Sequence, residues 1–389
     1  MDERMTYRTA SIIAYIAFFA VVLALPLVLN SFWTNRVAIY LVYSICAIGI
    51  SMSWGYAGIL SLGQGLFFGM GAYMLAMSLT LAVPENNPVP QLMLLNMEPN
   101  AVRDLCCVTT GSFLWIPFRS VAVGMIAGIV VPCILAAGIG YVMFKRRTTG
   151  VYVSIITLAF ALIGQLLIIN NQPLTGGFNG LADLALLEIG GFEFDPYGPS
   201  AYYAVAFTLI AVILLARYML TGRIGQVLKA IREDEARARY LGYDVENFKL
   251  FIFCVSAGVA GLAGMLFTLT SEFATPSLMA TSLSISMVIW AATGGRASLL
   301  GACIGALIVN FVGSLASESA TFQPVWPIIL GLLFVVVVLF MPNGIAGIFK
   351  AFIERNGRTE RLGETRPSGK TERSDKSERV QTELTAREA

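Results

Sequence analysis

The sequence LFIFCVSAGVAGLAGMLFTLT, residues 250–270, decides the fold. These 21 residues contain no charge. As an α-helix they would extend about 31 Å at ~1.5 Å per residue, close to the roughly 30 Å thickness of a bilayer's hydrocarbon core. Gly258, Gly261 and Gly264 recur at every third position, a pattern that favours close helix packing through small residues. The stretch therefore predicts a membrane-spanning helix in tight contact with its neighbours.

The rest of the chain repeats this pattern. Hydrophobic residues make up 57% of the 389 residues and charged residues 13%, with a mean hydropathy of +0.74, whereas a soluble domain averages about 25% charged residues. A shorter apolar stretch, 283–292, indicates a tilted, broken or re-entrant crossing. We predict an all-α polytopic membrane protein with about ten transmembrane helices, whose other spans are 12–29, 37–53, 66–83, 121–144, 151–169, 201–217, 299–315 and 326–341.

Basic residues orient these spans. With a cytoplasmic N-terminus, the inner connections hold 13 basic residues before the tail is counted, and the outer connections hold only Arg36, Arg103 and Arg119. The positive-inside rule then predicts that both termini are cytoplasmic. The first span is too long for a cleavable signal peptide, and no small-x-small site follows it.

The connections divide the chain into parts. We expect a transmembrane domain over 1–350, with long outer loops at 84–120 and 170–200 and a charged cytoplasmic loop at 221–249. Long loops are commonly functional. Residues 351–389 are dominated by charged and small polar residues without apolar periodicity, which predicts a disordered cytoplasmic tail.

The sequence lacks residues that several classes of protein require. Histidine is absent, and the six cysteines show no C-x-x-C spacing, so we expect no metal site, no cofactor and no histidine-based hydrolase. The adjacent Cys106 and Cys107 are either a redox pair or two ordinary loop thiols. Residues 367–371, PSGKT, resemble the end of a P-loop, but Glu364 occupies the position where that motif requires glycine. Any ATP hydrolysis must therefore come from another subunit, and no nucleic-acid partner is indicated.

The predicted spans contain no Asp or Glu. Ion-coupled transporters usually carry ionisable groups near the midplane, so this absence favours a small neutral solute. Candidate polar groups for a path are Ser61 and Gln64, which lie in a glycine-rich stretch at 54–65. This stretch is either a plain cytoplasmic turn or an interrupted helix whose backbone lines a polar path.

Further candidates lie on or beside the span 151–169. Thr157 and Gln165 are eight residues apart and fall close to one helical face, and Asn170 follows the span. The alternative for each is an ordinary hydrogen bond between helices.

The loop 221–249 carries charges of both signs beside a helical stripe formed by Leu228, Ile231, Ala236, Tyr240 and Leu241. Gly242 would end that helix. The two interpretations are an amphipathic helix on membrane lipid and a docking helix for a cytoplasmic protein.

Four segments carry a family resemblance: GYAGILSLGQGLFFGMGAY (55–73), GVYVSIITLAF (150–160), TGGRASLLGACIGA (293–306) and the long stretch 222–267. In order and spacing, from about 47 to 347, they resemble the branched-chain amino acid permease family of ABC importers. The resemblance implies a bacterial inner-membrane permease that pairs with a homologous second permease. It also implies two cytoplasmic ATPase subunits and an extracytoplasmic substrate-binding protein.

Within that family, T-G-G-F-N-G-L at 175–181 and the insertion at 84–120 resemble the urea and short-chain amide branch, in particular the second of its two permeases. The resemblance implies an outer rim or gate at Thr175, Gly176, Gly177, Phe178, Asn179 and Gly180, although the stretch is equally an ordinary glycine-rich turn.

The family's coupling region falls on 230–242, and the resemblance assigns ATPase coupling to Ala230, Arg232, Glu233, Asp234, Glu235, Ala236 and Gly242. Arg237 replaces the second alanine of the E-A-A-x-x-x-G pattern, and Gly242 comes one residue late.

The function implied is import of urea or short-chain amides as a non-enzymatic transport subunit. The alternatives are a branched-chain amino acid permease, a passive urea or amide channel, and a membrane scaffold without transport.

Overall fold

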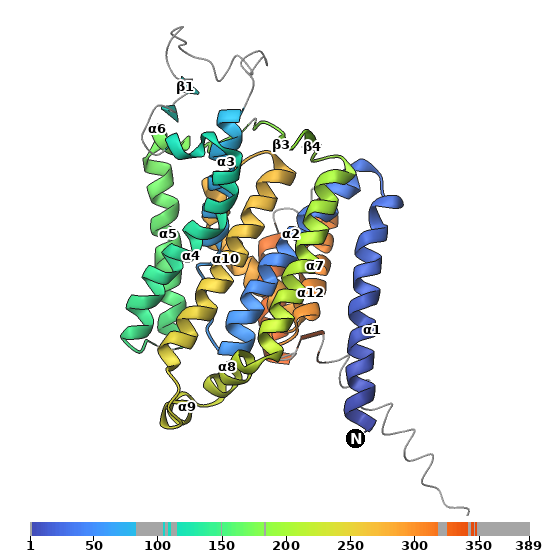
Figure 1. The fold of residues 1–389 in the computed structure, drawn as a ribbon, viewed down its shortest axis with the longest axis vertical. Helices are drawn as coiled ribbons and strands as arrows, with labels where there is room; N and C mark the ends of the chain where they lie inside the picture. The colour runs from blue at the N-terminus through green and yellow to red at the C-terminus, as the bar shows by residue number, and fades with distance from the viewer. Residues whose placement is uncertain are drawn as a thin grey trace, which may run out of the picture.

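The computed structural model describes residues 2–82, 104–105, 108–109, 115–148, 150–182, 184–317, 325–340, 344–345 and 347. The predicted tail, most of the outer loop at 84–120, the Cys106–Cys107 pair and the P-loop-like stretch lie outside these residues. The described part is a bundle of helices with two very short strand pairs (Figure 1).

Every predicted span coincides with a helix, which confirms the all-α class. Seven helices in the described residues are long and apolar enough to cross a membrane. α11 has only 14 residues, about 21 Å, so the predicted short segment is confirmed as short. The helices of 14 or more residues among those described are α1 (Asp2–Ala24), α2 (Ser31–Ile50), α3 (Gln64–Ala82), α4 (Val121–Lys145), α5 (Val151–Asn170), α7 (Pro199–Thr221), α10 (Val245–Ser271), α11 (Thr281–Gly294), α12 (Leu299–Ser317) and α13 (Trp326–Phe340).

Short elements gather at the two ends of the bundle (Figure 1). One end carries α8 and α9 together with the beginning of α1. The opposite end carries α6 and the antiparallel pairs β1–β2 and β3–β4, in which Leu187 is opposite Phe194. The bounds are α6 Gln172–Thr175, α8 Arg223–Glu233, α9 Glu235–Tyr240, β1 Asp104–Leu105, β2 Val108–Thr109, β3 Leu187–Ile189 and β4 Phe192–Phe194. Short 3-10 helices cover Leu25–Leu27, Ile116–Arg119 and Pro276–Met279, and a π-helical turn covers Ser51–Tyr56.

Helix α10 forms the centre of the bundle and packs against α2, α3 and α4. Its glycines allow this approach: a Cβ on Gly264 would overlap the carbonyl oxygen of Phe68, and one on Gly261 would meet Gly128 and Pro132. The close packing predicted from the glycine spacing is confirmed, because backbone takes the space that larger side chains would need.

The outer faces of α4 and α5 carry exposed apolar side chains, among them Ile126, Ile134, Ile155 and Leu166. In water such a surface would be unfavourable. These faces therefore suit contact with lipid or with another membrane subunit.

The glycine packing predicts a contrast between two alanine substitutions. Gly264→Ala should destabilise the protein by about 1–3 kcal/mol, because its methyl group has no room beside the Phe68 backbone. Gly138→Ala, which meets nothing within 4 Å, should be neutral or stabilising by up to about 1 kcal/mol. Melting temperatures of the purified variants in detergent measure the difference, and equal melting temperatures would contradict this packing account.

Candidate functional site

The chain between α2 and α3 interrupts the helical pattern. α2 continues as one wide π-helical turn, Ser51–Tyr56, and regular structure is then absent until Gln64 begins α3. We call residues 57–63 the interrupted segment. Ala57, Ile59 and Ser61 in it are buried, and Gly58 has a positive φ of 73°. Apart from the exposed Gly58, the interrupted segment is therefore buried or half-buried among the helices.

Side-chain hydroxyls pair with the backbone of this segment. Ser154 Oγ donates to the Leu60 carbonyl at 2.7 Å, and Thr157 Oγ1 accepts from the Leu62 amide at 3.1 Å. Both hydroxyls belong to the first two turns of α5. Because hydrocarbon offers no hydrogen bonds, backbone outside a helix can persist at membrane depth only where protein groups or a water-filled cavity satisfy it. Here α5 supplies those groups.

Gln64 joins the interrupted segment to α10. Its side chain is 0% exposed, and Nε2 donates to both the carbonyl and the hydroxyl of Ser256 at 3.0 Å. Ser256 Oγ in turn donates to the Gly49 carbonyl at 2.7 Å. The Gly65 amide donates to Ser284 Oγ of α11 at 3.0 Å. Ser154, Thr157, Ser256 and Ser284 form what we call the hydroxyl cluster.

One acceptor in this region has no partner. Gln64 Oε1 is buried and makes no hydrogen bond with any of the described residues. A buried carbonyl left without a hydrogen bond costs about 1–3 kcal/mol. Such a group calls for an explanation, and a bound molecule that donates a hydrogen bond to it would be one. The Nε2 atom orients the amide because both of its bonds go to Ser256.

The surroundings of Gln64 are polar but uncharged. Among the described residues, Lys249 is the one buried charged side chain, and it is neutralised by an ion pair with Glu235. It lies two helical turns before Ser256 on α10, toward the α8–α9 end. The site can therefore offer hydroxyl, amide and backbone groups to a solute without a counter-charge.

The structure groups some of the predicted path residues and separates others. Ser61, Gln64 and Thr157 lie at the interrupted segment, with Ser61 Oγ accepting from the Gly63 amide at 3.4 Å. Gln165 is half-buried about 12 Å farther along α5 than Thr157, and Asn170 is exposed where that helix ends. Ser154, Ser256 and Ser284 were missed from sequence. The spacing of Ser154 three residues before Thr157 was the one available signal.

The predicted outer rim is a glycine turn anchored to the bundle. Gly176, Gly177 and Gly180 all have positive φ, between 59° and 76°. Thr175 Oγ1 donates to the Ile168 carbonyl at 2.7 Å, and the Leu181 backbone pairs with Ala274 in both directions. This leaves Phe178 80% exposed and Asn179 exposed as well. The stretch 175–181 thus has turn geometry, and it also exposes the Phe178 ring at the end of the bundle opposite α8 and α9 (Figure 1).

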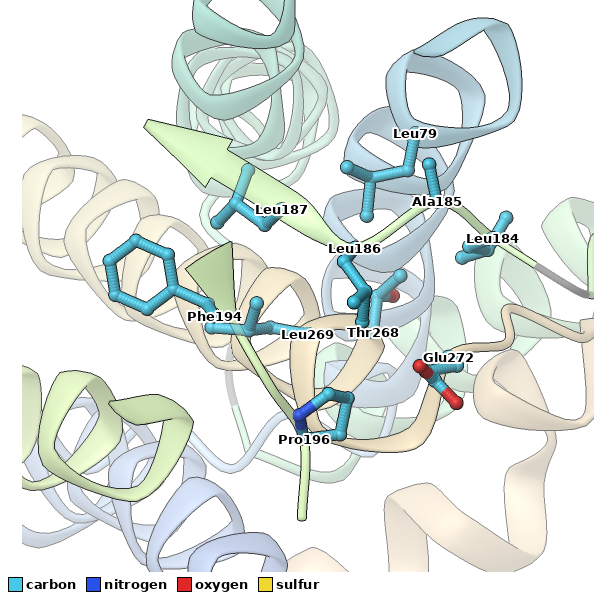
Figure 2. A pocket seen from close by; sticks show the side chains of 10 residues that line it. All are labelled: Leu79, Leu184, Ala185, Leu186, Leu187, Phe194, Pro196, Thr268, Leu269 and Glu272. Carbon is cyan, nitrogen blue, oxygen red and sulfur yellow. The ribbon is translucent and has the colours of Figure 1, made fainter. Parts of the chain in front are cut away.

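A small, partly open pocket lies at the same end, between the β3–β4 region and the ends of α3 and α10 (Figure 2). Its lining is mostly apolar, with Leu79 from α3, Leu269 from α10 and Phe194 from β4; Thr268 and Glu272 are its polar exceptions. So few polar groups suit a small polar solute poorly.

The predicted coupling helix is two helices. Asp234 has extended backbone angles (φ −156°, ψ 104°), and its carboxylate caps α9 by accepting from the Arg237 amide at 3.0 Å. The predicted single stripe is wrong beyond Ile231, because the break redirects α9: Tyr240 is 93% exposed, whereas Ala238 is buried. The predicted stop is confirmed, since Gly242 has a φ of 87° directly after α9.

Ion pairs hold α9 against α10 and the α4–α5 connection. Glu235 pairs with Lys249, and Arg239 pairs with Glu246 at 3.0 Å. Arg147 approaches the same Glu246 carboxylate at 3.6 Å. The remaining predicted coupling residues, Ala230, Arg232, Glu233 and Ala236, are all exposed. Arg232 also donates a hydrogen bond to the Gly55 carbonyl of the π-turn.

The hydroxyl cluster predicts a specific loss of stability. Thr157→Val keeps the side-chain shape but leaves the part-buried Leu62 amide without its acceptor, at a cost of about 1–3 kcal/mol. Thr208→Val is the matched control, because Thr208 bonds only to the Ala204 carbonyl of its own helix, and it should change stability by less than about 0.5 kcal/mol. Thermal melting in detergent compares the two, and an equal effect would contradict the assigned role.

Comparison with known proteins supports the permease resemblance. The family profile described as "Branched-chain amino acid transport system / permease component" matches residues 32–338. The Escherichia coli high-affinity branched-chain amino acid transport system permease protein LivM is 25% identical, over 85% of this chain and 73% of its own. The probable LivM of Methanocaldococcus jannaschii is 21% identical, over 78% and 90%.

A further relative is named as a permease for a different solute. The ribose import permease protein RbsC of Haemophilus influenzae is 26% identical, over 48% of this chain and 59% of its own. No solved structure matches. Because the family profile covers more than half of the sequence, the chain belongs to the branched-chain amino acid transport system permease family and is a permease subunit of the ABC-importer type.

Proposed function

We propose that this permease forms the membrane path for urea or short-chain amides. The observation that carries the proposal is the buried Gln64 amide, whose oxygen has no partner in an uncharged setting. Urea is neutral and has N–H donors and a carbonyl acceptor, so hydroxyl, amide and backbone groups suffice to replace its hydration. The urea-type sequence T-G-G-F-N-G-L at 175–181 supports the same solute.

The path begins at the outer end, where the binding protein releases its solute near the exposed Phe178. It continues past Ser61, Gln64 and Thr157 at the interrupted segment. Gln165 and Asn170, on α5 between these two levels, remain proposed contacts along the way. Alternating access would open the segment first toward the outer end and then toward the α8–α9 end.

The proposed assembly follows the two ends of the bundle. A homologous second permease covers an apolar outer face, and two ATPase subunits dock on the cytoplasmic end, where α8 and α9 expose Ala230, Glu233 and Ala236. The binding protein docks at the opposite end. We place the protein in a bacterial inner membrane with both termini cytoplasmic, the transmembrane domain over 1–350, the coupling loop at 221–249 and a disordered tail over 351–389.

The second candidate solute is a branched-chain amino acid, and the names of the relatives favour it. A zwitterion would need paired charges along its route or a strongly dipolar site. The buried polar groups at the interrupted segment are neutral, which is why we rank urea and amides first. A passive channel is less consistent with the ion-paired α8–α9 unit, because a channel needs no docking surface for an ATPase.

Uptake of labelled urea at low micromolar concentration tests the proposal, in cells with the intact gene, without it, and with the gene restored. We expect ATP-dependent uptake that is lost with the gene, is competed by acetamide and is insensitive to leucine. Acetamide shares the amide group that Gln64 would recognise, so its competition reports on that chemistry.

Two other outcomes would contradict the proposal in different ways. Loss of leucine uptake with urea uptake unchanged would assign the permease to branched-chain amino acids. Urea uptake that persists after ATP depletion would indicate a passive channel.

A further inference from the structure

Arg232 of α8 turns toward the bundle. Its Nη1 atom donates a hydrogen bond to the carbonyl oxygen of Gly55, in the π-turn that ends α2. The neighbouring carbonyls of Ser53 and Trp54 accept from the Ile59 and Gly58 amides. The last carbonyls of a helix need partners from outside it, and for Gly55 a charged side chain from another helix fills that need.

A second side chain of α8 contacts the same turn. Lys229, one helical turn before Arg232, places its ammonium 5.4 Å from the centre of the Tyr56 ring. The stem of Arg232 lies against Gly58, where a Cβ would come within 3.2 Å of Arg232 Cγ. α8 therefore contacts residues 55–58 on both sides of the point where the interrupted segment begins.

On its other face α8 packs against α9 and the beginning of α10. Ile231 packs with Ala238 of α9 and Val245 of α10 in a separate apolar core. The Glu235–Lys249 ion pair joins the same two helices. A displacement of α8 would act on the contacts that α8 makes with other elements, of which the hydrogen bond to the Gly55 carbonyl is one.

We propose that the Arg232–Gly55 hydrogen bond transmits movement of the α8–α9 unit to the interrupted segment, with Arg232 as a positioning residue. The π-turn suits this role, because its wide coil lacks regular α-helical bonding and changes shape more readily than the helices around it. A shift of Gly55 would pass directly to residues 57–63 and to Gln64. This inference rests on the proposed assembly with ATPase subunits.

The coupling ratio of the assembled transporter tests this inference. The complete complex in proteoliposomes is assayed for ATP hydrolysis and solute uptake, with Arg232→Ala, Arg232→Lys and the control Arg237→Ala. Arg237 lies in the same unit, but its side chain is 81% exposed and pairs only locally with Asp234. We expect R232A to retain ATP hydrolysis within about two-fold while uptake per ATP falls at least ten-fold, and R232K to restore part of the ratio.

The control separates coupling from docking. If Arg237 contacts an ATPase, R237A lowers hydrolysis and uptake together and leaves their ratio unchanged. The same parallel loss in R232A, or an unchanged ratio, would overturn the inference. If the wild-type complex imports leucine and not urea, the solute proposal fails and the ratio is measured with leucine, so the two failures are distinguishable.

Discussion

Backbone polar groups inside a membrane must find partners within the protein, and the structure around residues 57–63 depends on this constraint. The interrupted segment leaves the helical ladder at Tyr56, yet α5 pairs with its Leu60 and Leu62 backbone. α10 and α11 then fix the first residues of α3 through Ser256 and Ser284.

The same arrangement explains why the interrupted segment suits transport. A neutral solute that replaces one of these hydrogen bonds leaves no charge unpaired, and Gln64 already holds an unused acceptor. The glycines at the α3–α10 contact keep the frame rigid, whereas the π-turn at its edge can change shape. Rigid helices with one deformable connection between them allow a local change to open a path without unpacking the bundle.

Long uncharged runs predicted the helices correctly, because crossing a bilayer demands them, and even the short α11 was anticipated from its length. The hydroxyl cluster was largely missed, since Ser256 meets Gln64 across 192 positions of sequence and nothing local marks that contact. The break at Asp234 was not predicted, because the residues around it favour helix. In the structure its extended backbone and its carboxylate, which accepts from the Arg237 amide, both show the break. Arg232 has the charge of a docking residue, and its inward contact with Gly55 depends on the tertiary fold.

Chemical labelling of a cysteine at position 61 tests most directly whether the interrupted segment lines the path. In a background without the six native cysteines, Ser61→Cys would be exposed to a small thiol reagent in the assembled transporter, with Phe178→Cys as the accessible reference. The account predicts modification only during ATP turnover, slowed by urea. A thiol at position 61 that stays unreactive throughout turnover, or one that urea does not protect, would contradict it.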